Sequence, residues 1–273
     1  GSIIASITDS THFELNQATT GGAVTNGTLT FRSNQGDRNI AIGSSALAAT
    51  TTGDDNVAVG AYAGDAVTTG YRNVFIGRDS GGLLTDNYDN IAIGAYAFDA
   101  ANGGEHDNVA IGVYALSSET SSSGCVAIGS DALKLQNRAS SQNTAIGYLA
   151  GAAIPASTGG VSSTILGYNA VGVGAMTGNN NTVLGHNAGA NITSPDDCVI
   201  IGESACGTGV LTGNNNVVVG VTAGEALTSG LSNVLIGKAA GLNLTDNYGC
   251  IAIGHAALDA ANIGEHDNVA IGT

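Results

Sequence analysis

Large aromatic side chains are scarce in this chain. Tryptophan is absent and aromatic residues make up 4% of 273 positions, which excludes an ordinary globular core filled by aromatic rings. The interior must instead be filled by Val, Ile, Leu and Ala. Charged residues reach only 11%, about half the usual quarter. We therefore expect a surface covered by Asn, Ser, Thr, Gly and Asp.

Basic residues are also few. Seven bases oppose 22 acids, giving a net charge of -15, and this charge repels a phosphate backbone. We therefore expect no nucleic-acid partner. No apolar run approaches the roughly twenty residues that cross a bilayer, so we expect no membrane insertion by this segment. The four cysteines form no CxxC or Cys/His pattern, and we expect neither a cofactor nor a metal site.

A short motif, first seen as Asn39-Ile40-Ala41-Ile42-Gly43, dominates what is present. Its glycine recurs fourteen times at spacings of 17 to 20 residues. The motif glycines are Gly43, Gly60, Gly77, Gly94, Gly112, Gly129, Gly147, Gly167, Gly185, Gly202, Gly220, Gly237, Gly254 and Gly272. A fixed period of this size predicts a stack of similar units, each resting on its neighbours. We therefore expect an all-β parallel solenoid, or β-roll, of about fourteen coils of 17–18 residues.

Each repeat contains one short strand, as in Val57-Ala58-Val59. Alternation predicts that the branched pair points one way and the middle residue the other. We place the branched pair inside the coil and the small middle residue on a second packed face. Glycine after the strand suits a sharp corner. Alanine three residues later, as in Ala63, suggests a second extended segment.

Asparagine stands at the strand entrance in ten coils. Stacking would align these amides as a ladder that satisfies corner backbone groups, although a ligand-binding column is the alternative. The ten are Asn39, Asn56, Asn73, Asn90, Asn108, Asn143, Asn181, Asn216, Asn233 and Asn268. Three cysteines, Cys125, Cys198 and Cys250, replace Asn at this position. We expect them to be small buried residues.

A coil of this size encloses little apolar volume. Two or three buried branched side chains stabilise it by about 1.5–3 kcal/mol each, while ordering its backbone costs roughly 1–2 kcal/mol per residue. The balance predicts an obligate homo-oligomer. We expect the chains to meet at the column of small middle residues that includes Ala58 and Ala92.

The array contains a large internal duplication. Residues 53–112 match residues 213–272 at 38 of 60 positions, an offset of nine coils. Such duplication lengthens a fibre or multiplies a binding surface. Residues 37–273 form the repeat array. Residues 1–36 lie outside it, and we expect them to cap the first coil or to continue a preceding shaft; the chain as a whole reads as a fragment of a longer protein.

The recurring Asn-Val-Ala-Ile-Gly-x-x-Ala resembles the head repeats of YadA-type trimeric autotransporter adhesins. Similar repeats occur in phage tail-fibre and other surface-fibre proteins. The resemblance covers residues 37–273 and implies a left-handed β-roll, three chains side by side and adhesion at a cell or virion surface. The repeats here are longer than those of the adhesin heads, and we find no neck, coiled-coil or membrane-anchor segment within this fragment.

Candidate site residues are few. Tyr62, Tyr96 and Tyr114 share the position two after the glycine, and outward rings there would stack on sugars; the alternative is an aromatic ladder at a subunit edge. Glu105-His106-Asp107, repeated as residues 265–267, is the nearest approach to a metal cluster, but consecutive residues of an extended chain point apart. No catalytic triad or nucleophile elbow is present, so we assign no catalytic or metal-binding residue.

These observations favour an adhesive or spacer region of an extracellular, homotrimeric surface fibre, with a cell-surface glycan as the expected ligand. A purely structural tail-fibre shaft is the first alternative. A polysaccharide depolymerase, with paired carboxylates across a subunit groove, is the second. We expect the protein not to be an enzyme.

Overall fold

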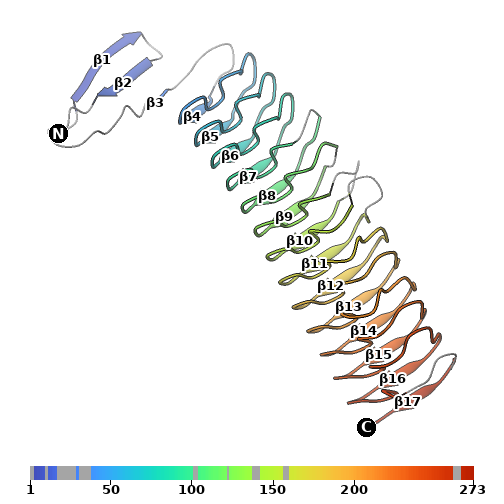
Figure 1. The fold of residues 1–273 in the computed structure, drawn as a ribbon. Helices are drawn as coiled ribbons and strands as arrows, with labels where there is room; N and C mark the ends of the chain where they lie inside the picture. Colours follow the sequence, from blue (N-terminus) through green and yellow to red (C-terminus); the bar gives the residue numbers. More distant parts are fainter. Residues whose placement is uncertain are drawn as a thin grey trace.

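The computed structural model describes residues 3–9, 12–16, 29–30, 38–100, 104–121, 123–136, 142–155, 160–260 and 266–273. Within these ranges the chain is all β and contains no helix, so none crosses a membrane. Figure 1 shows the array as a row of narrow coils stacked along one axis. The predicted parallel solenoid is confirmed.

Fourteen three-residue strands, one per coil and joined by thirteen turns of chain, form one parallel sheet. Each strand pairs with the next along the chain, and equivalent residues are partners. The strands are β4 (Ile40–Ile42), β5 (Val57–Val59), β6 (Val74–Ile76), β7 (Ile91–Ile93), β8 (Val109–Ile111), β9 (Val126–Ile128), β10 (Thr144–Ile146), β11 (Thr164–Leu166), β12 (Thr182–Leu184), β13 (Val199–Ile201), β14 (Val217–Val219), β15 (Val234–Ile236), β16 (Ile251–Ile253) and β17 (Val269–Ile271).

Three further strands precede the array. β1 (Ile3–Asp9) and β2 (His12–Asn16) pair as an antiparallel ribbon. β3 (Leu29–Thr30) pairs antiparallel with β4 and becomes the first strand of the large sheet. This pairing covers part of the edge that β4 would otherwise expose. It is compatible with the expected capping role of residues 1–36, which stays a prediction.

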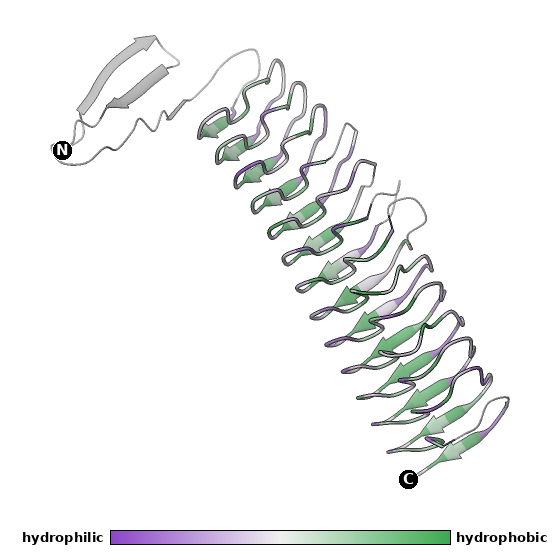
Figure 2. Ribbon diagram, in the orientation of Figure 1, coloured by the Kyte–Doolittle hydropathy of each residue, from purple (hydrophilic) through white to green (hydrophobic). Residues whose placement is uncertain are grey.

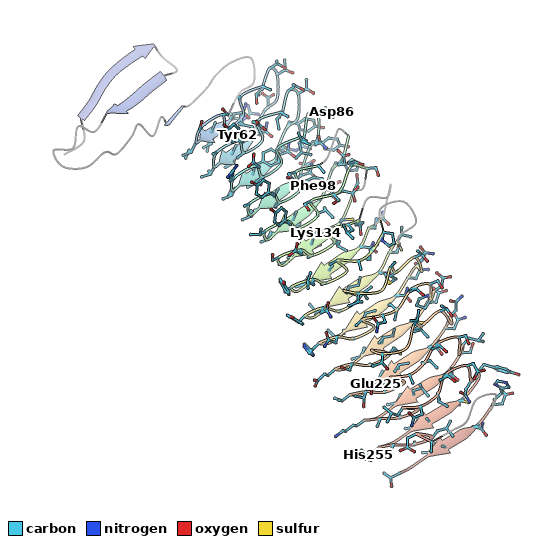
Figure 3. The ribbon with its side chains drawn as sticks, in the orientation of Figure 1. Tyr62, Asp86, Phe98, Lys134, Glu225 and His255 are labelled. Carbon is cyan, nitrogen blue, oxygen red and sulfur yellow. The ribbon has the colours of Figure 1, made fainter. Side chains whose placement is uncertain are left out.

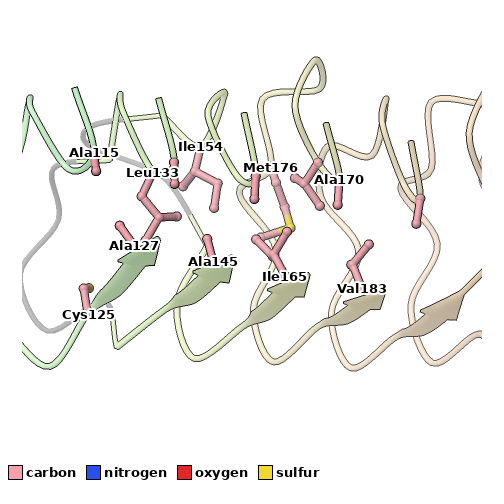
Figure 4. Close-up of a cluster of buried hydrophobic side chains, with 14 of the residues drawn as sticks. Ala115, Cys125, Ala127, Leu133, Ala145, Ile154, Ile165, Ala170, Met176 and Val183 are labelled. Carbon is pink, nitrogen blue, oxygen red and sulfur yellow. The ribbon is translucent and has the colours of Figure 1, made fainter. Parts of the chain in front are cut away.

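The inside and outside of the strands are opposite to our prediction. The middle strand residue is buried in β4 to β16, whereas the first and third residues are partly or fully exposed. Ala58 and Ala92, for example, are fully buried. The column of small middle residues is therefore core, so copies of the chain cannot meet there. Figure 4 shows Ala127, Ala145, Ile165 and Val183 pointing into the coil interior.

The segment after the motif glycine is a turn, not the expected second strand. The amide of Ala63 donates to the carbonyl of Gly60, three residues back, at 3.4 Å. Ala63 and its equivalents are nevertheless buried, and they pack opposite the middle strand residues. The interior is thus narrow, with these small residues on one side and the middle strand residues, which range from Ala58 to Phe75, on the other.

Large core residues occupy alternative positions in different coils. Five coils carry Leu or Phe four residues after the motif glycine, and all five have Ala in the middle of the strand: Leu47, Phe98, Leu116, Leu133 and Leu258. Six coils have Gly there, and all six carry a large apolar residue three positions later: Val67, Leu84, Ile154, Ile192, Leu227 and Leu244. The two arrangements fill a similar interior volume in different ways, as close packing requires.

The motif glycines make the corners that stacking needs. At Gly94 the φ angle is +133°, and an added Cβ would lie 2.5 Å from the carbonyl oxygen of Gly112 in the next coil. Both the backbone conformation and the close approach of the next coil exclude a side chain. The prediction for this position is confirmed.

The asparagine column is a buried ladder, as predicted. The amide nitrogen of Asn73 donates to the carbonyl of Asn87 at 2.8 Å, and its side-chain oxygen accepts from the backbone of Asn90 at 3.0 Å. Asn56 and Asn216 make equivalent contacts with the coils that follow them. Each amide satisfies backbone groups that water cannot reach.

Cysteine takes over one side of this ladder. Cys125, Cys198 and Cys250 are buried, as expected, and form no disulfide among the described residues. The backbone N–H of Asn216 donates to the Cys198 sulfur at 3.3 Å. The sulfur thus replaces the lost acceptor, and its S–H, 3.5 Å from the carbonyl of Gly213, is a weaker donor than the lost amide.

Candidate functional site

The exposed first and third residues of β4–β17 form a continuous apolar surface, which we call the outer stripe. Of its 28 positions, 25 are Val, Ile or Leu, three are Thr and none is charged. Figure 2 shows the apolar strands following one another down the molecule. The outer stripe exists because alternate residues of a strand point to opposite faces. Only the middle residue points into the coil, so the first and third residues point outward.

The outer stripe is large for a surface left in water. With strands about 4.8 Å apart and about 10 Å long, fourteen of them cover roughly 600 Å². A folded monomer rarely exposes a contiguous apolar patch above a few hundred Å². Ile40, Ile42 and Ile91 are 39%, 38% and 36% exposed, so the apolar surface is accessible. This is the strongest interaction surface in the described part of the chain.

The predicted tyrosines lie along a corner of the solenoid, next to the outer stripe. The rings of Tyr96 and Tyr114 stack with centroids 5.2 Å apart. The Arg78 guanidinium lies 5.8 Å from the Tyr96 centroid, and the Lys134 ammonium lies 4.8 Å from the Tyr114 centroid. Arg78 comes from the coil before the pair and Lys134 from the coil after it, so each ring is covered on both faces.

Tyr62 differs from the other two tyrosines. Asp79 occupies the equivalent position in the coil between Tyr62 and Tyr96, and Tyr62 stacks on no other ring among the described residues. Its side chain is exposed, and Figure 3 labels it near the N-terminal end of the array.

The cations beside the other two rings are neutralised locally, because Arg78 pairs with Asp79 at 2.9 Å and Lys134 pairs with Asp131 at 2.7 Å.

Three further ring columns were not predicted. Tyr71, Tyr88 and His106 stack at 5.1 and 4.8 Å, and Tyr248 stacks on His266 at 3.6 Å. These residues all stand two before the Asn position. Tyr148, Tyr168 and His186 stack at 5.4 and 5.3 Å and stand one after the motif glycine. The shared offsets were visible in the sequence and could have revealed each column.

The Glu105-His106-Asp107 segment does not converge on one point. Glu105 is buried, and its carboxylate accepts a hydrogen bond from the Asn87 side chain. His106 Nδ1 lies 2.9 Å from an Asp107 carboxylate oxygen at the surface. In the described residues no group of three His, Cys, Asp or Glu side chains is arranged to hold a metal ion. The repeat of this segment begins at Glu265, which lies outside the described residues.

One carboxyl group, that of Asp99, is a weaker acid than usual. Partial burial, reinforced by the charge of Asp79, raises the pKa of Asp99 to about 6. Burial likewise raises the pKa of Asp65, and the negative charge of Asp79 raises it further. In contrast, the hydrogen bond from Arg72 lowers the pKa of Asp89 at the surface.

A scan against protein families finds no match for this chain, and a search of curated proteins finds no significant relative.

Proposed function

We propose that the chain is a spacer segment of a homotrimeric surface fibre, in which the outer stripes of three copies pack around a common axis. The observation that carries the proposal is the uncharged, apolar outer stripe, which runs through every coil. Removing that surface from water stabilises an assembly by about 25 cal/mol per Å². The resemblance to trimeric adhesin heads supports three copies and a left-handed roll, at a cell or virion surface.

The spacer role follows from uniformity. Each coil repeats the last, the duplicated block lengthens the array without adding a new arrangement of residues, and the described tyrosine faces are mostly occupied. A stiff column of this kind separates what lies at its two ends. A structural tail-fibre shaft would have the same construction, and a depolymerase would need a carboxylate pair across a groove between copies.

The experiment that tests the trimer places a charge on the outer stripe. In Ile91→Glu, assembly would bury three carboxylates without partners, so we expect the molar mass from light scattering to fall to that of one chain. Thr69→Glu is the control because Thr69 is exposed on a polar turn outside the outer stripe. Retention of a trimer by Ile91→Glu would contradict the proposal.

Adhesion to a glycan is the second candidate function, and Tyr62 is the observation in its favour. A sugar stacks on a ring face, and Tyr62 is the one member of the predicted trio without a stacked neighbour. On a glycan array, Tyr62→Ala should lose a signal that Tyr96→Ala retains. If both variants retain every signal of the parent chain, the corner does not bind glycans and the spacer role stands alone.

A further inference from the structure

The outer stripe has one interruption. Its three threonines, Thr144, Thr164 and Thr182, are the first residues of β10, β11 and β12, and strand pairing places them side by side. The third residues of these strands stay apolar, as Ile146, Leu166 and Leu184. The polar step is therefore confined to one edge of the outer stripe and to three consecutive coils.

The opposite edge of the same three coils is also distinctive. Tyr148, Tyr168 and His186 follow the motif glycines there and form the stacked column described above. Their side chains are well exposed, with Tyr168 at 52%. In no other coil does a Thr at the start of the strand accompany an aromatic or His residue after the glycine. We call these six residues the polar band.

The apolar parts of the outer stripe cannot define an axial register. Coils before β10 and after β12 present Val or Ile at both positions, so sliding one chain by one coil would bury nearly the same side chains. Register is weakly specified wherever a pairing surface is uniform. A polar residue in an otherwise apolar interface is the known remedy, since it penalises every alignment that leaves it without a partner.

Symmetry brings the two edges of the polar band together. In a threefold assembly, the three equivalent strands lie perpendicular to the axis and follow one another around it. The end of each strand therefore meets the beginning of the next. At equal height, the Thr edge of one copy then faces the Tyr and His edge of its neighbour. Among the hydrogen bonds of the described residues, none uses the hydroxyl of Thr144, Thr164 or Thr182. Those hydroxyls can donate to or accept from the phenol and imidazole groups opposite.

We propose that the polar band sets the axial register between copies of this chain: Thr144, Thr164 and Thr182 of one copy meet Tyr148, Tyr168 and His186 of the next. The inference rests on the proposed trimer and identifies the partner surface as a second copy aligned coil for coil. A slip of one coil leaves the Tyr148 phenol against Val126 or the His186 imidazole against Val199 at the ends of the band. Each such mismatch lowers the population of the slipped form by about tenfold.

The test uses cysteine cross-linking between co-expressed chains. Val217→Cys in one chain is combined with Val219→Cys in the other for the same coil, or with Ile201→Cys or Ile236→Cys for the adjacent coils. We expect disulfides only in the same-coil combination, because a disulfide requires Cα atoms within about 7 Å. In the background T144V/T164V/T182V, which removes the hydroxyls at nearly constant shape, we expect adjacent-coil disulfides to reach yields comparable to the same-coil product.

A matched background, T52V/T69V, removes two hydroxyls from exposed turns outside the outer stripe and should leave the cross-linking pattern unchanged. Equal cross-linking of same-coil and adjacent-coil pairs in the parent chain would overturn the inference, as would an unchanged pattern in the triple variant. Light scattering of each sample separates the two proposals. A monomeric parent refutes the trimer itself, whereas a trimer with mixed register refutes only the polar band.

Discussion

At the scale of single residues, buried amides hold the coils together more specifically than apolar contact does. Asn73 is fully buried and bridges the backbones of two neighbouring coils. Asn73→Ala would leave the amide of Asn90 and the carbonyl of Asn87 without these partners, at a cost of about 1–3 kcal/mol per buried group. We expect a loss of about 3 kcal/mol in the free energy of unfolding, measured by denaturant titration.

Asn73→Cys provides the matched comparison, because Cys198 shows that sulfur accepts the backbone N–H in this position. The cysteine variant should lose about half as much stability as the alanine variant. Equal losses would mean that the ladder acts through packing volume and not through its acceptor.

Asp99 predicts a pH dependence of stability. Its pKa is about 6 in the folded chain, against an ordinary value of 3.8, so the folded state binds the proton more tightly than the unfolded state. The stabilising contribution is complete below about pH 4 and is lost as pH rises through 6. In Asp99→Asn the melting temperature should change less between pH 4 and pH 6.5 than in the parent chain, and it should be higher at pH 7. A variant that follows the parent's pH profile would contradict this assignment.

At the scale of the coil, large core residues stand either four or seven positions after the motif glycine. Converting one arrangement into the other in a single coil tests whether both fill the same interior volume. Gly241 has a φ angle of +59°, and an added Cβ would lie 2.8 Å from Leu244 and 2.9 Å from Leu235. Gly241→Leu alone should overfill the core and destabilise the chain by about 1–3 kcal/mol. Leu258 in the next coil has a similar φ of +56° beside Ala252, so the backbone accepts leucine there when space is available.

The triple variant L235A/G241L/L244A gives this coil the residues that the next coil has at the equivalent positions, Ala252, Leu258 and Ala261. We expect it to be more stable than Gly241→Leu alone, although it carries two additional truncations of the core. The measurement is the urea midpoint of both variants. A triple variant less stable than the single one would show that the two arrangements are not interchangeable.

The sequence predicted the outline of the coil but not which face of its strand is buried. The period, the strand positions, the corner glycines and the Asn ladder were all readable, because each depends on a residue type that only one local structure accepts. The sequence did not show which face of the strand points into the coil. A Val-Ala-Val pattern fixes alternation, but it is the same pattern whichever face is inside. The turn after Gly60 resolves the question, since Ala63 and the residues beyond it already fill a narrow interior.

The tyrosine site was only partly predictable. Tyr62, Tyr96 and Tyr114 share one position in the repeat, as the sequence shows, but their environments depend on residues one coil away. Arg78 and Lys134 reach the rings from coils before and after, and neither cation has a fixed relation to the motif. Such contacts follow from the stacking of side chains and not from the period of the sequence.

At the scale of the whole molecule, the outer stripe makes assembly the central question. The fold encloses a thin core and leaves an apolar column outside, and that column has no charged residue although the chain has a net charge of -15. Repulsion between those charges keeps fibres apart, while the uncharged outer stripe lets copies of one fibre meet. The same arrangement explains why the interface is expected on the branched pair and not on the alanines.

The most direct measurement is the molar mass of the unmodified chain by sedimentation equilibrium, with circular dichroism recorded on the same sample. The account predicts a β-rich species of about 80 kDa, three times 26.7 kDa, that persists on dilution. A well-folded β-rich species at 26.7 kDa would show that the outer stripe is stable in water, and it would contradict the account.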